Sequence, residues 1–150
     1  MVSEQFAKLW LRMQSDYQAY MERELAPDLT EVQLHALERI LSMERAKPSD
    51  LISHLNISPA AISTLVDRME KNEILVRQRD EYDRRIVWLV VTEKGRSQYE
   101  RGIEIRKKYF VSRLGALSEH NQKLLVFLMG KIVPERSENG AANDSVRQVN

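Results

Sequence analysis

The chain has 150 residues, with 23 Lys and Arg against 22 Asp and Glu, and it contains no cysteine. With 43% hydrophobic and 30% charged residues it has the composition of a globular protein, which excludes a wholly disordered or collagen-like chain. The absence of cysteine excludes disulfides and thiolate metal sites, and the formal net charge of +1 gives no bulk electrostatic reason to expect nucleic acid as a partner.

No apolar run approaches the roughly 18 residues that a membrane helix needs. The first residues also lack the basic segment and apolar run of a secretory signal. We therefore expect a cytoplasmic protein without a membrane partner.

The first predicted element is a helix over residues 6–25, in which apolar residues recur every three or four positions and so share one face. They are Phe6, Leu9, Met13, Tyr17, Met21 and Leu25. Pro27 ends this helix, and Thr30 with Gln33 forms a capping box that begins the next one. The predicted buried face of the second helix consists of Leu34, Leu37, Ile40 and Leu41.

A helix-turn-helix is predicted next. A short third helix begins around Pro48, and Asn56 tolerates the left-handed backbone of a tight connection. Ser58 caps a fourth helix, in which Pro59 takes the first position. Two helices joined by three residues, the second well capped, are typical of a helix-turn-helix.

The hydrophobic period then changes to that of strands. Residues 75–77 and 86–91 are rich in β-branched and aromatic side chains, and the polar residues 78–85 between them predict a hairpin with an exposed tip. Thr92 begins a further long helix and Ser118 the last one, whereas residues 134–150 are predicted to be a disordered tail. The fold class is mainly α with a small β-hairpin wing (α+β), a winged helix-turn-helix.

This order of elements favours a function in DNA binding. A helix fits the major groove, and a hairpin beside it can reach the neighbouring minor groove. Opposite its apolar stripe the fourth helix presents small and polar side chains, and the hairpin carries several arginines, which a narrow minor groove attracts. The helix could instead have an ordinary solvated face, and the hairpin charges could simply keep a strand edge in water. Four arginines in nine residues favour DNA; they are Arg77, Arg79, Arg84 and Arg85.

Specific motifs support this interpretation. Residues 55–70, LNISPAAISTLVDRME, resemble the recognition-helix region of the MarR family of bacterial transcription regulators. Asp83-Arg84-Arg85 and the later Thr92-Glu93-Lys94-Gly95 resemble the wing and the following helix start of the same family. The resemblance covers about residues 5–133. One departure is Lys47, where such proteins often have a threonine that caps the third helix.

The resemblance implies a homodimer that reads a near-palindromic double-stranded operator, more often as a repressor than as an activator. It implies that Arg85 enters the minor groove and that Asp83 orients it. The residues implied at the major groove or at adjoining phosphates are Ser58, Pro59, Ala60, Ser63, Thr64 and Arg68. Residues 1–133 would form a single domain, with the DNA-binding lobe at about 30–92 and dimerisation helices at about 3–25 and 93–133.

The resemblance also implies a small aromatic or anionic effector. Tyr17, Met21 and His35 are residue types that could line its site, but we assign no ligand residue. The three histidines show no metal-binding spacing, and no catalytic motif is present, so we expect no metal, no cofactor and no enzymatic activity. The rival hypothesis is a helical interaction module whose wing binds an acidic protein.

Near-neutrality extends to the proposed DNA-binding region. Residues 47–85 contain seven Lys and Arg and seven Asp and Glu, a difference of zero. Any DNA binding must therefore depend on where individual positive groups are placed rather than on net charge. We expect non-specific DNA binding to be weak and sensitive to salt.

Overall fold

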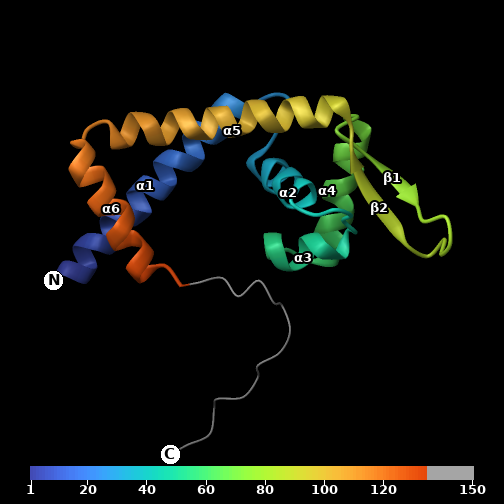
Figure 1. Cartoon of the computed structure of the whole chain (residues 1–150), viewed down its shortest axis with the longest axis horizontal. Helices are drawn as coiled ribbons and strands as arrows, with labels where there is room; N and C mark the ends of the chain where they lie inside the picture. The colour runs from blue at the N-terminus through green and yellow to red at the C-terminus, as the bar shows by residue number, and fades with distance from the viewer. Residues whose placement is uncertain (135–150) are drawn as a thin grey trace, which may run out of the picture. The chain divides into compact units, whose positions relative to one another are not determined.

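The computed structural model describes residues 1–134, so the predicted tail lies, except for Pro134, outside the described residues. The described part of the chain forms six helices and one two-stranded antiparallel sheet (Figure 1). In chain order the elements are α1 (Val2–Leu25), α2 (Glu31–Leu41), α3 (Ser49–Leu55), α4 (Pro59–Lys71), β1 (Leu75–Arg79), β2 (Val87–Val91), α5 (Glu93–Leu114) and α6 (Glu119–Ile132). The predicted fold class is confirmed.

The chain divides into two compact units, one of residues 1–113 and one that begins at Leu114. The first unit contains α1 to α4, the hairpin and nearly all of α5, and α6 belongs to the second. None of the helices within residues 1–134 is both long and apolar enough to cross a membrane.

The hydrophobic core is formed by α2, α3, α4, the hairpin and the end of α1. Leu34, Leu37, Val66 and Met69 are fully buried there. The predicted inward face of α2 is largely confirmed, but Leu41 is only half-buried and the small Ala36 is buried instead. Leu41 is the last residue of α2, so its side chain extends past the packed turns of the helix.

The caps predicted from the sequence are present. Thr30 Oγ1 accepts a hydrogen bond from the Gln33 amide at 3.2 Å, and the Gln33 side chain accepts one from the Thr30 amide at 3.0 Å. Ser58 Oγ accepts from the Ala61 amide at 3.2 Å, and Asn56 is left-handed with a φ of 52°. The turn of the helix-turn-helix thus begins with the left-handed Asn56 after α3 and ends with the capping side chain of Ser58 before α4.

The third helix begins one residue later than predicted, with Pro48 as its N-cap. Although Lys47 cannot cap as threonine would, the Asp50 carboxylate accepts a hydrogen bond from the Lys47 amide at 2.7 Å. This bond points back toward the N-terminus, like the second bond of a capping box. It anchors the first turn of α3 without a capping threonine.

Strands β1 and β2 pair from Leu75 with Val91 to Arg79 with Val87. The first strand is two residues longer than predicted, because Gln78 and Arg79 continue the pairing although polar residues give little strand signal. Ala46, from the segment between α2 and α3, forms a bridge with Leu89, and its carbonyl accepts from the Leu89 amide at 2.8 Å. The hairpin projects beyond the helices of the first unit (Figure 1).

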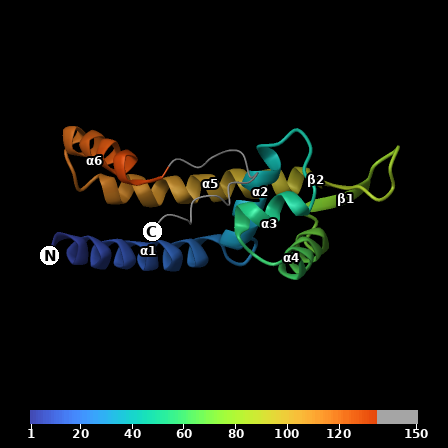
Figure 2. The ribbon, with the colours of Figure 1, turned by 90° about the horizontal axis from the view of Figure 1, so that it is seen from below.

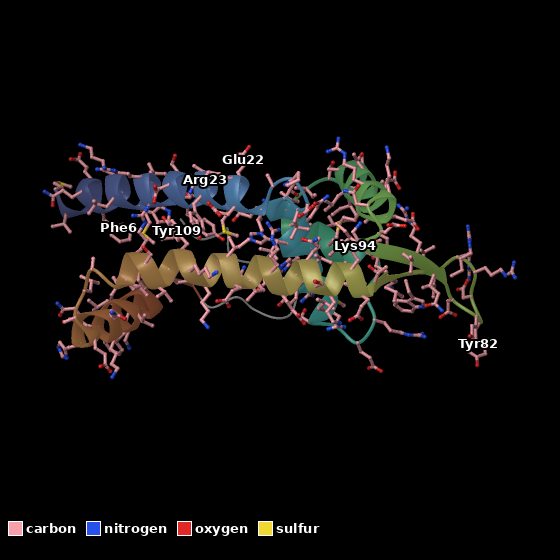
Figure 3. The ribbon with its side chains drawn as sticks, turned by 90° about the horizontal axis from the view of Figure 1, so that it is seen from above. Phe6, Glu22, Arg23, Tyr82, Lys94 and Tyr109 are labelled. Carbon is pink, nitrogen blue, oxygen red and sulfur yellow. The ribbon has the colours of Figure 1, made fainter. Side chains whose placement is uncertain are left out.

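Helices α1 and α5 run side by side in opposite directions (Figure 2). Four aromatic rings, those of Tyr17, Tyr20, Tyr109 and Phe110, pack between them with centroid separations of 5.1–5.4 Å. The Tyr109 hydroxyl donates to Asp16 at 2.9 Å, and Figure 3 shows Tyr109 between the two helices. Aromatic packing of this kind stabilises helix pairs beyond simple burial of area.

Candidate DNA-binding surface

Helix α4 separates its apolar and polar residues cleanly. Its inward face consists of Ile62, Leu65, Val66 and Met69, all buried. The six residues predicted to contact DNA are all exposed; they are Ser58, Pro59, Ala60, Ser63, Thr64 and Arg68. The small side chains lie at the start of the helix, which allows its backbone to approach another surface closely.

An open groove of about 850 Å³ lies between the start of α2 and helix α4. Thr64 and Arg68 line it, together with Lys71, which was not among the residues predicted from the sequence. Lys71 follows Arg68 by three positions and so lies on the same side of the helix. That spacing is the signal by which Lys71 could have been found.

The wing tip presents Arg85 in a defined orientation. Its amide and Nε donate to Asp83 Oδ1 at 3.1 and 3.0 Å, and its Nη2 donates to Oδ2 at 3.0 Å. The Arg85 side chain is nevertheless 92% exposed. These hydrogen bonds hold the pKa of Asp83 below and the pKa of Arg85 above their ordinary values, so both groups stay charged. The Asp83 carboxylate thus orients the Arg85 guanidinium and leaves it exposed to solvent.

Arg77 lies apart from the wing tip. It donates to Glu70 Oε2 and to Asp67 Oδ1, each at 2.6 Å, and is only 30% exposed. Its backbone amide and guanidinium lower the pKa of Glu70. Arg77 therefore joins β1 to α4, and the structure does not place it with the other predicted wing residues. Arg79 lies nearer the tip and donates to the Arg84 carbonyl at 3.0 Å.

Of the residues considered for an effector site, Tyr17 and His35 both interact with Glu31, whereas Met21 belongs to the core. Met21 is fully buried in the core. Tyr17 is half-buried, and burial, followed by the negative charge of Glu31, raises its pKa to about 12. His35 Nε2 lies 3.8 Å from Glu31. Among residues 1–134, no three His, Asp or Glu side chains come together in a way that could hold a metal ion.

A helix-turn-helix followed by a hairpin with an exposed arginine defines a winged helix-turn-helix protein. Residues 29–87, which run from just before α2 to the first residue of β2, match the model of the MarR family. This match confirms, over these residues, the resemblance to the MarR family that the sequence motifs predicted.

The curated relatives are transcriptional regulators of the helix-turn-helix type. The transcriptional repressor MdtR of Bacillus subtilis is 23% identical over 124 residues, which cover 83% of this chain and 78% of that protein. The uncharacterized transcriptional regulator YwhA of the same organism is 28% identical over 83 residues. That alignment covers 55% of this chain and 60% of YwhA, so the chain spans less than two thirds of the length of this relative. These relatives are transcriptional regulators and not enzymes.

Solved structures show the same fold. A MarR family protein from Bacillus stearothermophilus superposes with a TM-score of 0.77 at 23% identity, covering 87% of this chain and 92% of that one. BpsR of Bordetella bronchiseptica, whose DNA binding is regulated by 6-hydroxynicotinic acid, superposes with a TM-score of 0.67 at 22% identity. It covers 85% of this chain and 98% of its own. At these identities the likeness establishes the fold.

Proposed function

We propose that the protein is a sequence-specific regulator of transcription that binds double-stranded DNA as a homodimer and acts as a repressor. The observation that carries this proposal is the geometry of Arg85, an exposed guanidinium that Asp83 orients at the tip of a wing beside helix α4. A guanidinium so placed fits the narrow minor groove of A·T-rich DNA. The proposal places the protein in the cytoplasm, with the DNA it would regulate.

In this proposal helix α4 reads the major groove. The side chains of Ser63 and Arg68 make no hydrogen bond within residues 1–134 and have donors to offer, whereas the Thr64 hydroxyl donates to the Ala60 carbonyl at 3.2 Å. Thr64 thus keeps its oxygen as an acceptor. Ser58, Pro59 and Ala60 form the start of the helix, where close approach to a base edge or a phosphate is possible. Arg79 and Arg84 supply further positive charge at the wing.

A second copy of the chain is the proposed partner of the apolar residues that the single chain leaves exposed. Phe6, Leu9, Trp10 and Met13 on α1 are each at least 45% exposed. None of the residues of α6 is buried, although it carries Leu124, Leu125, Phe127, Leu128 and Ile132. A two-fold dimer would cover such surfaces and hold two recognition helices about 34 Å apart, one turn of DNA.

Release from DNA by a small aromatic or anionic effector completes the proposal. The relative MdtR is a repressor, and DNA binding by BpsR is regulated by 6-hydroxynicotinic acid, which is both aromatic and anionic. An effector shifts the protein between two states only to the extent that it binds one more tightly than the other. The state with lower DNA affinity would be the one in which the two recognition helices no longer match the half-site spacing.

The test is selection of random duplex DNA by the purified full-length protein. We expect enrichment of a two-fold symmetric site with A·T pairs beside each half-site. The double variant Arg68→Ala/Arg85→Ala is the control, because it keeps the fold but removes one group from the helix and one from the wing. Enrichment of no sequence by the wild type would overturn the proposal and favour the interaction module with an acidic protein partner.

A further inference from the structure

The wing tip is organised around a second carboxylate, that of Asp80. Its Oδ1 accepts hydrogen bonds from the amides of Tyr82 at 2.9 Å and Asp83 at 3.0 Å. Its own amide donates to the Ile86 carbonyl at 3.0 Å, across the base of the tip. Asp80 therefore fixes the backbone from which both Tyr82 and Asp83 project, and Figure 3 shows Tyr82 at the outer end of the wing.

The other oxygen of Asp80 connects the tip to strand β2. Asp80 Oδ2 accepts from Trp88 Nε1 at 2.8 Å and lies 3.5 Å from Arg45 Nη1. The Asp80 side chain is only 13% exposed, although it lies in an otherwise solvated turn. The hydrogen bond from Trp88, followed by those from the two amides, lowers the pKa of Asp80, so the carboxylate is charged at neutral pH.

Trp88 in turn connects the wing to the segment between α2 and α3. The Arg45 guanidinium lies 5.0 Å and the Lys47 ammonium 5.9 Å from the centre of its ring. The neighbouring residues Ala46 and Leu89 form the backbone bridge described above. Three consecutive residues of the α2–α3 segment thus contact β2 or the wing tip, through cation–π attraction and a backbone hydrogen bond.

These contacts form a continuous path to the DNA-binding arginine. It runs from Arg45 and Trp88 to the Asp80 carboxylate, from there to the Asp83 amide, and from the Asp83 carboxylate to Arg85. We propose that Asp80 and Trp88 are positioning residues, which hold the wing tip against the α2–α3 segment so that Arg85 points in one direction. The inference rests on the proposed function, because its effect is exerted through Arg85 on DNA.

The chain offers a matched control for Asp80. Glu81 is its neighbour in the tip, is exposed, and makes no hydrogen bond or ion pair with any part of residues 1–134. Asp80→Asn and Glu81→Gln remove the same charge near the DNA, which by itself strengthens attraction to phosphate. Only Asp80→Asn also removes a group that positions Arg85, and this loss weakens binding to DNA. Of the two variants, Asp80→Asn should therefore bind DNA more weakly than Glu81→Gln.

The experiment measures affinity for the operator that the wild type selects. We expect Asp80→Asn and Trp88→Phe each to lower affinity about fivefold, and Glu81→Gln to leave it unchanged or raise it. Trp88→Phe keeps an aromatic ring for Arg45 but removes the donor to Asp80, so the fold is retained. Thermal unfolding of each variant verifies this.

A double-mutant cycle with Arg85→Ala decides whether the two residues act through Arg85. We expect Asp80→Asn and Trp88→Phe to cause no further loss in the Arg85→Ala background. Equal losses in both backgrounds, or a loss in Glu81→Gln matching that in Asp80→Asn, would overturn the inference. If Arg85→Ala alone leaves affinity and sequence preference unchanged, the wing assignment itself fails, and if the wild type selects no operator, the proposed function fails.

Discussion

Arg85 is the single side chain on which the proposed minor-groove contact depends. We expect Arg85→Ala to lose the preference for A·T over G·C pairs beside each half-site, because a guanidinium gains most where the groove is narrow and its potential most negative. The expected loss is about tenfold in affinity for the A·T-flanked operator, the effect of one good contact. Fluorescence anisotropy titrations of two operators, one flanked by A·T pairs and one by G·C pairs, measure this loss.

Arg84→Ala is the control at the same scale, because it removes an equal charge from an exposed neighbour that has no carboxylate partner within residues 1–134. It should weaken binding to both operators alike and leave their ratio unchanged. An Arg85→Ala protein that still distinguishes the two operators would contradict the minor-groove role.

The contrast between Arg85 and Arg77 shows what sequence reasoning could reach at the level of single residues. Asp83 and Arg85 are two positions apart, so their pairing was foreseeable from local chemistry. The partners of Arg77 are seven and ten positions away, on another element. No local pattern predicts such a pair, because it depends on how β1 is placed against α4. The roles assigned to these residues in DNA binding stay predictions.

At the scale of elements, the helices were well predicted because their apolar residues keep a strict period and their caps are local. The ends of the strands and the backbone conformation between elements were not predicted where contacts with other elements determine them. Strand β1 continues through Gln78 and Arg79 because the partner strand supplies the hydrogen bonds. Glu73, between α4 and β1, adopts a left-handed φ of 60° that nothing in its residue type predicts.

The glycine in the first turn of α5 has a structural reason that the sequence motif alone does not show. A Cβ on Gly95 would lie 1.9 Å from the Ile74 carbonyl oxygen, so helix and backbone could not pack as they do. We expect Gly95→Ala to lower the free energy of unfolding by about 3 kcal/mol. Chemical denaturation measures this loss.

Gly102→Ala is the matched control in the same helix. Its added Cβ would meet a methyl group of Leu34 at 2.6 Å, and a side chain can move where a backbone carbonyl cannot. Both substitutions also gain about 1 kcal/mol of helix propensity. Gly102→Ala should therefore cost clearly less than Gly95→Ala. Equal stability of Gly95→Ala and the wild type would show that this contact is not as tight as described.

Helices α2 and α5 are joined by an ion pair that should respond to pH. Arg106 donates to both Glu38 oxygens, at 2.6 and 3.1 Å, and these hydrogen bonds lower the pKa of Glu38 from its ordinary value of 4.5. A lowered folded pKa means that the pair stabilises the fold fully above about pH 4.5 and ceases to do so as the pH falls through the lowered value.

We expect Glu38→Gln to be less stable than the wild type at pH 7, by no more than about 1 kcal/mol because the pair is partly exposed and screened. The difference should shrink as the pH falls below 4.5 and through the lowered pKa, as denaturant titrations at pH 7 and at an acidic pH would show. Glu100→Gln, at an exposed position of α5 without an ion-pair partner in residues 1–134, should match the wild type throughout. A Glu38→Gln deficit that is the same at both pH values would contradict the assignment.

At the scale of the whole molecule, the exposed apolar residues of the terminal helices predict dimerisation. Phe127 on α6 is 60% exposed in the single chain. Phe127→Glu should raise the dissociation constant of the dimer at least about tenfold, since a charge would enter an apolar interface. Light scattering across a dilution series measures the mass.

The control for this prediction is Val76→Glu on the wing, a substitution of similar character at a residue that is 45% exposed. It should leave the mass unchanged, because the wing lies outside the proposed dimer surface. A wild-type protein that is monomeric at all concentrations would contradict the dimer.

The internal pairing of Arg77 bears on the thermodynamics of association with DNA. Of the seven basic side chains in residues 47–85, Arg77 and Arg85 have carboxylate partners within the described chain. The others, Lys47, Arg68, Lys71, Arg79 and Arg84, have none there. Each that meets a phosphate releases condensed counterions, whose entropy drives binding and adds about 0.9 to the salt slope. Arg77 is already paired with the carboxylates of Asp67 and Glu70 on α4. It would therefore release no condensed counterions on DNA binding, and it stabilises the packing of β1 against α4 instead.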